Sequence, residues 1–194
     1  MTDIAGFFGN KNVNVVSPLG GQFSWFTDWI GDGSKQYHTY MTKELPPLIY
    51  RAVGSYSGFP APSDPEAAQQ VSLTLMGGGA SAEAMWGPLG GPLWVQHDPS
   101  RNVTKLKGVG VYAAASAGGQ GDVDKLPPGF GNCTGGLIEG IVLNNTRKFA
   151  DAAAAAGVPI TFVTRPEGSH TWGLFESEMQ ESWNTVIGPA LGVV

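Results

Sequence analysis

The feature that most constrains the fold is a strand, a helix and a second strand that follow one another in the C-terminal half of the chain. Lys107–Ala115 reads as an apolar strand, Leu137–Ala156 as a long helix with an apolar stripe, and Pro159–Thr164 as a second apolar strand. Gly157 ends the helix as its C-cap. Apolar strands connected through a helix are typical of a parallel sheet that is covered on its faces. The sequence therefore predicts an α/β fold with a mostly parallel sheet flanked by helices.

Weaker patterns predict the remaining elements: a strand at Asn12–Ser17, a helix at His38–Leu48, a buried strand at Arg51–Ser55, a helix beginning at Ser63–Glu66, mostly loop at Met76–Pro99, and a last amphipathic helix at Thr171–Ile187. No internal repeat and no low-complexity linker interrupts the chain. We therefore expect residues 1–194 to form a single domain.

The composition excludes several classes of protein. Charged residues make up 14% of the chain, against about 25% in an ordinary soluble domain. The 11 Lys and Arg residues are scattered and outnumbered by 16 acids, which argues against a nucleic-acid partner. No apolar run has the length of a transmembrane segment, and one cysteine with no zinc-type spacing predicts no metal site. The N-terminus MTDIAGFFGNKN has no secretory signal, so the sequence leaves the location of the protein open.

Reactive side chains follow the two strands of the C-terminal half. Asp122 and Asp124 lie after the first of these strands, and His170 lies after the second. Loops at the carboxyl ends of parallel strands are where such folds gather functional residues. An acid followed by a histidine matches the second half of an α/β-hydrolase triad, in which the acid orients the imidazole and the imidazole takes a proton. The alternative is that His170 is a surface residue and the aspartates form turns or helix caps.

The nucleophile that such a triad needs is not evident. A Gly-x-Ser-x-Gly turn between a strand and a helix would hold it. The nearest stretch, Gly54–Gly58, has Tyr56 at the position of the serine, and prolines follow it in place of a helix. Ser57 is the one alternative nucleophile in this stretch.

Several motifs resemble a known family. They are Val15–Pro18 with Gly20-Gly21-Gln22, Thr27-Asp28-Trp29, Thr42–Pro46, Met85–Pro88, Pro92–Trp94 and Gly168–Trp172. Together they resemble the antigen 85-type mycolyltransferases, a branch of the esterase-type α/β-hydrolases, over most of the chain.

The resemblance implies roles for individual residues. His170 would be the catalytic histidine, with Ser169 and Trp172 beside the sugar or acyl site. Two further substrate contacts, Gln22 and Trp29, come from the segment that resembles the family's glycine-glycine-glutamine loop.

The resemblance also implies an acid, which in the family is a glutamate in the loop after the strand that matches Val109–Tyr112. Gln120 stands at the position we count as equivalent, and glutamine cannot carry the charge. Asp122 or Asp124 is expected to substitute, with Asp122 slightly favoured.

The chain departs from the family in two places. The family has three strands before the one that matches Asn12–Ser17, and a further strand, the nucleophile elbow and a helix before the segment that matches Tyr50–Ser57. We therefore expect an N-terminally truncated domain that lacks the nucleophilic serine and the oxyanion hole. Open sheet edges would then allow self-association.

The resemblance implies mycolyl transfer to trehalose or cell-wall arabinogalactan through a serine acyl-enzyme, without a cofactor and outside the membrane at the cell wall. Because the nucleophile is missing, we expect this chain to be inactive. One alternative is a non-catalytic protein that binds trehalose or a trehalose mycolate-like glycolipid, with tryptophans such as Trp25, Trp86 and Trp94 stacking on sugars rather than packing in the core. The other is a degenerate gene product.

Overall fold

The computed structural model describes residues 3–15, 25–39, 51–125 and 133–194. The chain divides into two compact units. The first unit comprises Met1–Val15, Tyr50–Ala61 and Pro99–Val194, and the second comprises Val16–Ile49 and Pro62–Asp98.

The first unit is built on a three-stranded parallel sheet. Its strands are β1 (Ala52–Tyr56), β2 (Gly110–Gly119) and β3 (Thr161–Glu167), in the spatial order β1-β2-β3. Both pairings are parallel, and a register shift lies in β2 between Ser116 and Gly119. The strands predicted at Arg51–Ser55, Lys107–Ala115 and Pro159–Thr164 are confirmed with shifts of a few residues at their ends, and so is the fold class.

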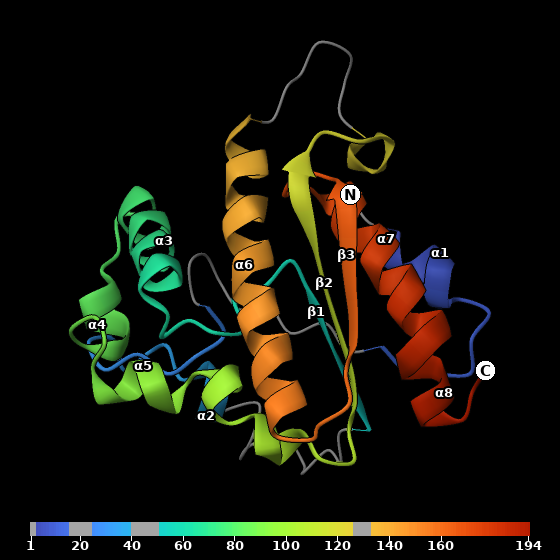
Figure 1. Ribbon diagram of the computed structural model, residues 1–194, viewed down its shortest axis with the longest axis horizontal. Coiled ribbons are helices and arrows are strands. Elements are labelled where there is room, and N and C mark those ends of the chain that lie inside the picture. The colour runs from blue at the N-terminus through green and yellow to red at the C-terminus, as the bar shows by residue number, and fades with distance from the viewer. Residues whose placement is uncertain (1–2, 16–24, 40–50, 126–132) are drawn as a thin grey trace. The chain divides into compact units, whose positions relative to one another are not determined.

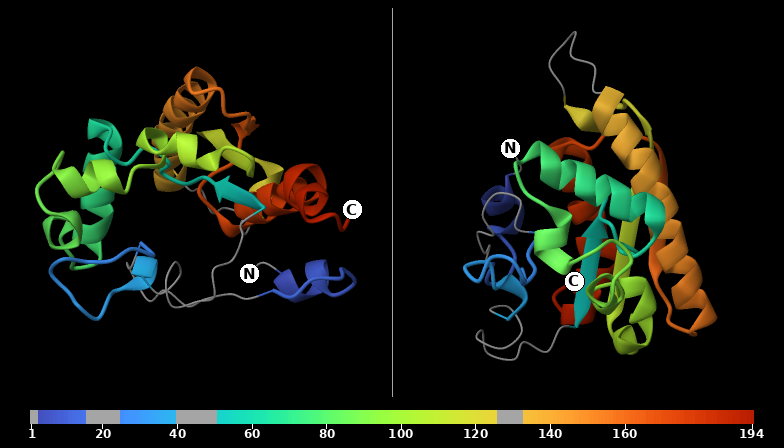
Figure 2. Two further views of the ribbon diagram at one scale, coloured as in Figure 1. Left: turned by 90° about the horizontal axis from the view of Figure 1, so that it is seen from below. Right: turned by 90° about the vertical axis from the view of Figure 1, so that its left-hand side faces the viewer.

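The two faces of β2 are covered by different helices (Figures 1 and 2). On one face, Val111 and Ala113 pack against Phe149 and Ala153 of α6 (Cys133–Ala155). On the other face, Tyr112 and Ala114 pack against Val186, which lies in the π-helical turn η5 (Trp183–Ile187) that continues α7 (Trp172–Ser182). The alternation follows from the strand period of two residues. As a result, α6, which connects β2 to β3, and the helical segment α7–η5, which follows β3, cover opposite faces of the sheet.

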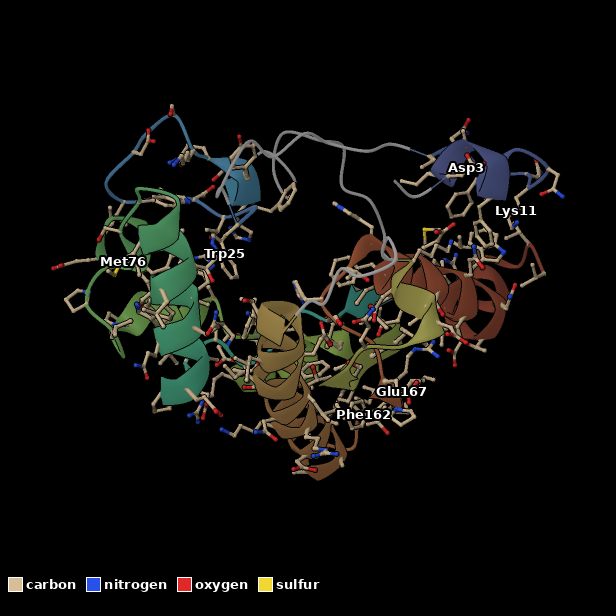
Figure 3. The ribbon with its side chains drawn as sticks, turned by 90° about the horizontal axis from the view of Figure 1, so that it is seen from above. Asp3, Lys11, Trp25, Met76, Phe162 and Glu167 are labelled. Atoms are coloured by element: carbon tan, nitrogen blue, oxygen red, sulfur yellow. The ribbon has the colours of Figure 1, made fainter. Side chains whose placement is uncertain are left out.

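Short elements complete the first unit: α1 (Ile4–Phe8), η2 (Pro99–Arg101), η3 (Val103–Leu106), η4 (Asp122–Asp124) and α8 (Gly188–Leu191). The side chain of Asp3 caps α1 by accepting from the Gly6 N–H, and Phe8 packs edge-to-face on Trp183 with 5.1 Å between ring centroids. Lys11, labelled in Figure 3 beside the same cluster, lies 3.8 Å from the centroid of the Phe7 ring. The N-terminal segment is thus tied to the end of α7 by aromatic and cation–π contacts.

The predicted N-terminal strand at Asn12–Ser17 is wrong over its described part. Residues 12–15 have no strand pairing, and Ser17 lies outside the described residues. An apolar alternation by itself does not form a strand, because a strand needs a neighbour to accept its backbone hydrogen bonds. Of the predicted helix at His38–Leu48, the described part is α2 (Tyr37–Thr39).

The second unit contains helices where the sequence predicts mostly loop. Besides α3 (Pro65–Gly77), whose start agrees with the prediction, it holds α4 (Ala82–Trp86) and α5 (Pro92–Gln96) within Met76–Pro99. Their core residues are Val71, Leu75, Met85, Trp86 and Trp94. Trp86 and Trp94 pack edge-to-face with 5.1 Å between centroids. Two helices of a little more than one turn gain their stability from this buried cluster rather than from local propensity. In the described part of the chain, no helix has the length and apolar character needed to cross a membrane.

Candidate active site

His170 lies in the loop between β3 and α7 and contacts a carboxylate. Its Nδ1 is 2.6 Å from Oε1 of Glu139. The side chain of Glu139 is fully buried, whereas that of His170 is 32% exposed. The backbone N–H of His170 donates to the carbonyl of Gly135, at the beginning of α6. A buried acid that holds one imidazole nitrogen leaves the other nitrogen, Nε2, as the one that can take up a proton.

The second oxygen of Glu139 is held by groups from two strands. Its Oε2 accepts hydrogen bonds from the Ser57 hydroxyl at 3.0 Å and from the Ser116 backbone N–H at 3.2 Å. Ser57 directly follows β1, has a positive φ of 51° and donates its own N–H to the Ala114 carbonyl. The carboxylate is therefore oriented by β1 and β2 while it contacts a histidine that follows β3. Such support restricts the acid to one geometry.

A shallow hollow adjoins His170. It has a volume of about 360 Å³, and its lining includes His170, Trp172 and the ion pair between Lys125 and Glu176, whose charged atoms are 2.8 Å apart. The His170 ring packs edge-to-face on Phe175, with 4.9 Å between centroids. The imidazole is thus fixed on one side by a carboxylate and on another by an aromatic ring, and it faces a hollow lined by polar and aromatic groups. Among the described residues, no group of three His, Cys, Asp or Glu side chains could hold a metal ion.

Comparison with known proteins finds relatives that resemble this chain. No model of a known protein family matches the chain. The diacylglycerol acyltransferase/mycolyltransferase Ag85B of Mycobacterium intracellulare is 26% identical over 235 aligned residues, which cover 96% of this chain and 69% of the relative. Ag85A of Mycobacterium leprae is 25% identical over 90% of this chain and 65% of the relative. The chain is similar to the antigen 85-type mycolyltransferases along most of its length.

A solved structure shares the fold of this chain. MPT51 (FbpC1) of Mycobacterium tuberculosis superimposes with a TM-score of 0.80 over 100% of this chain and 82% of the other, at 21% sequence identity. The chain spans about two thirds of the length of the Ag85 relatives named above. Because the alignment with Ag85B is 235 residues long and the chain has 194, that relative carries segments without a counterpart here.

In the structure, the carboxylate that contacts His170 is not one of the two predicted aspartates. Asp124 is buried, and its carboxylate accepts from the Ser169 N–H at 2.8 Å and from the Thr171 hydroxyl at 2.8 Å. The side chain of Asp122 is exposed. Asp124 thus anchors the loop that carries His170, because the N–H groups and hydroxyls of a tight loop need acceptors. The carboxylate that contacts His170 is that of Glu139. It does not come from position 120, where the sequence has glutamine.

The helical pattern of the sequence indicates that the side chain of Glu139 is buried. Glu139 precedes the buried Val142, Leu143 and Thr146 of α6 by three, four and seven residues, so it lies on the buried face of the helix. A charged residue in such a stripe needs a partner. The predicted acids lie in the loop after β2, whereas Glu139 lies on a helix, 31 residues before His170.

The other predicted site residues lie in different environments. Ser169 is buried and donates to Asp124, so it supports the loop. Trp172 is 69% exposed and lines the hollow beside His170. Trp29 is buried in the core of the second unit with the Lys35 ammonium 3.9 Å from its ring centroid, so its indole is not open to a ligand. Gln22 lies outside the described residues.

Ser57 does not have the geometry of a relocated nucleophile. Its hydroxyl donates to Glu139, and its side chain is buried. A nucleophilic serine would instead donate to the free imidazole nitrogen. In the part of the chain that the structure describes, no serine hydroxyl is hydrogen-bonded to His170.

Proposed function

We propose that this chain carries an acyl-transfer site of the mycolyltransferase type, in which His170 is the general base and Glu139 is the acid that orients it. The observation that carries the proposal is the 2.6 Å contact between Nδ1 of His170 and the buried Oε1 of Glu139. The named activity of the Ag85 relatives supports the reaction class. The substrates we propose are a mycolyl ester as donor and a hydroxyl of trehalose or arabinogalactan as acceptor.

The proposed chemistry uses the two nitrogens of His170 differently. With Nδ1–H bonded to the carboxylate of Glu139, Nε2 is free to remove the proton of an attacking hydroxyl or water. The attacking oxygen forms a bond to the ester carbonyl carbon, and Glu139 stabilises the imidazolium that results. The imidazolium then returns its proton to the leaving alkoxide as the original ester bond breaks. No cofactor is needed for these steps.

We expect a low rate of acyl transfer because no free nucleophile is evident beside His170 in the described part of the chain. The Ser57 hydroxyl is engaged by Glu139, and we expect the segment that carries the family's nucleophile elbow to be missing from the chain. A triad without one member keeps only the acceleration that the oxyanion hole and substrate binding supply, and we expect the oxyanion hole to be missing here as well. We therefore expect the 194-residue chain to turn over acyl esters slowly, by general-base attack without an acyl-enzyme.

Hydrolysis of a p-nitrophenyl acyl ester tests the proposal. We expect His170→Ala and Glu139→Gln each to lower the rate by at least about tenfold, because general-base catalysis typically contributes more than this. Asp122→Asn is the matched control: it also removes one carboxylate charge, but from an exposed side chain, and it should retain the wild-type rate. Equal rates for the wild type and His170→Ala, with both proteins folded, would contradict the proposal.

A second candidate function is the binding of a trehalose mycolate-like glycolipid without turnover. The observation that favours it is the exposure of Trp172, because an indole face beside polar groups is suited to stacking on a sugar. We expect saturable binding in a calorimetric titration with trehalose. Trp172→Ala should abolish the signal while leaving the unfolding free energy unchanged, since the side chain is mostly exposed. Binding with no His170-dependent hydrolysis would favour this candidate over acyl transfer.

Self-association is a further part of the proposal. Within the described sheet, β1 and β3 are the edge strands, and edge strands offer unpaired N–H and C=O groups to another chain. Sedimentation velocity across a concentration series measures this directly. A single monomeric species throughout would exclude it.

A further inference from the structure

Ser116 is a buried polar residue near the carboxyl end of β2. Its exposed fraction is 0%, and it lies where the register of the β2–β3 pairing shifts. It follows the run Ala113–Ala115, whose residues are fully buried as well. A hydroxyl group at the end of such a run needs partners, because an unpaired buried polar group is costly. The partners of Ser116 lie on both sides of the His170–Glu139 pair.

The two donors of Ser116 reach different segments of the chain. Its backbone N–H donates to Oε2 of Glu139 at 3.2 Å. Its hydroxyl donates to the carbonyl of Gly168 and accepts from the N–H of Gly118 at 3.1 Å. Gly168 lies two residues before His170. Ser116 is therefore hydrogen-bonded both to the acid and to the loop that carries the base.

Gly168 holds the beginning of this loop against β2. It directly follows Glu167, the last residue of β3, which is labelled in Figure 3. Its N–H donates to the carbonyl of Gly119, so its N–H and its carbonyl both bond to β2. Its φ of 132° favours glycine, and an added Cβ would lie 2.8 Å from Cδ1 of Leu174. The Ser116 hydroxyl thus bonds to a carbonyl that the backbone itself holds in place.

These hydrogen bonds close a ring around the pair. His170 contacts Oε1 of Glu139, whose Oε2 accepts from the Ser116 N–H. The Ser116 hydroxyl binds Gly168, from which the chain runs through Ser169 back to His170. In a closed ring the distance between acid and base depends on every bond, because neither segment moves without the other. Support of this kind is what holds a site to one geometry.

We infer that Ser116 is a positioning residue for the His170–Glu139 pair: its N–H holds the acid, and its hydroxyl holds the loop of the base at the distance at which the two side chains meet. The catalytic meaning of this role rests on the proposed function. The effect on the contact between the two side chains does not, because it is a property of the folded chain.

The Nδ1–H proton of His170 reports this contact in an NMR spectrum without any need for turnover. The chain has three histidines, so the signal can be assigned by its loss in His170→Ala. Ser116→Ala removes the hydroxyl and keeps the backbone N–H. We expect this variant to raise the rate at which the Nδ1–H proton exchanges with water by roughly fivefold, the factor that corresponds to one hydrogen bond.

Thr146→Val is the matched control. It also removes a fully buried hydroxyl that donates to a carbonyl, but that carbonyl belongs to Val142 in the same helix, α6. The hydrogen bond that it removes therefore does not connect α6 to the loop of His170. This variant should keep the wild-type exchange rate of the Nδ1–H proton.

Hydrolysis of a p-nitrophenyl acyl ester separates positioning from a general loss of structure. We expect Ser116→Ala to lower kcat to a value between those of the wild type and His170→Ala, because a displaced catalytic group reacts more slowly. KM should stay unchanged, since Ser116 is fully buried. Ser116→Cys keeps a weaker donor at the same position, and it should lie between the wild type and Ser116→Ala in both exchange rate and kcat.

The inference is overturned by a wild-type exchange rate in folded Ser116→Ala, or by an equal increase in Thr146→Val. If Ser116→Ala fails to fold, a wild-type exchange rate in Ser116→Cys overturns it. Faster exchange in Ser116→Ala without any His170-dependent turnover in the wild type would overturn the proposed function and leave this inference standing. Turnover that depends on His170, with wild-type exchange and kcat in Ser116→Ala, would do the reverse.

Discussion

Gly118 and Gly136 bring the backbones of β2 and α6 into direct contact. A Cβ atom on Gly136 would lie 2.3 Å from the carbonyl oxygen of Gly118, and one on Gly118 would lie 2.2 Å from the carbonyl oxygen of Gly136. Both separations are far inside van der Waals contact. Glu139 lies about one helical turn beyond Gly136, so this approach sets how close the acid comes to the strand end and to His170.

We expect Gly136→Ala to separate β2 from α6. Forcing extra atoms into a packed interface costs about 1–3 kcal/mol of unfolding free energy, which urea denaturation can measure. In the same variant the hydrogen-bonded Nδ1–H signal of His170 should weaken. The matched control is Gly140→Ala in the same helix, where an added Cβ meets no atom within 4 Å. That substitution should stabilise the protein by about 0.5–1 kcal/mol through helix propensity. Equal stabilities for the two variants would contradict the close approach.

Asp124→Asn is expected to destabilise the loop that carries His170. The buried carboxylate accepts from Gly121, Ser169 and Thr171, and an amide replaces one accepting oxygen by a donor. Leaving buried groups unpaired costs about 1–3 kcal/mol, measured as a lower urea midpoint at unchanged slope. Asp122→Asn, two residues away and exposed, should stay within about 0.5 kcal/mol of the wild type. A loss shared equally by both variants would show that the charge and not the hydrogen bonding of Asp124 matters.

The stability of the first unit should depend on pH through Glu178. Glu178 lies on α7 with its side chain fully buried, and this burial raises its pKa from 4.5 to about 8 in the folded state. A group with a raised folded pKa contributes its stability fully below the unfolded pKa and loses it as pH rises through the folded pKa. The wild type should therefore lose stability relative to Glu178→Gln between about pH 4.5 and about pH 8, by a few kcal/mol in total. Urea unfolding of both proteins at acidic, neutral and alkaline pH measures the gap, and a gap that does not widen would contradict the prediction.

The second unit should weaken in acid through His97. Its ring stacks on Trp86 with 5.1 Å between centroids and meets the His38 ring edge-to-face at 5.6 Å. Burial first and His38 second lower the pKa of His97 below 6.5, with Asp28 acting in the opposite direction. A lowered folded pKa means that stability is present above the unfolded pKa and is lost as pH falls through the folded value.

Hydrogen exchange of the α4 and α5 amides reports this loss. We expect protection to fall as the pH drops below about 6.5. His97→Gln should lower protection at neutral pH, because the ring stacking is lost, but should flatten the dependence on pH. His170→Ala, in the other unit, should keep the wild-type dependence. A steep acid response in His97→Gln would assign the effect to another group.

The parts of the fold that were predictable are those with long, periodic patterns. The strand–helix–strand order of β2, α6 and β3 and the start of α3 follow from local alternation, helical periodicity and capping residues. The short helices α4 and α5 were not predictable, because each spans five residues and depends on the buried cluster around Trp86 and Trp94. The strand predicted at residues 12–17 failed for a related reason, since a strand needs a pairing partner.

The sequence by itself determined that this chain has an α/β fold, that it resembles the antigen 85-type mycolyltransferases, and that His170 follows a strand. Those properties reside in residue types and in spacings of a few positions, where local sterics and periodicity act. Only the tertiary structure decided that Glu139 and not Asp122 or Asp124 meets His170, that Ser57 supports the acid, and that Trp29 is buried. Each of these depends on a contact between segments far apart in the chain, because hydrogen bonding and burial in the folded state follow from packing that no local pattern records.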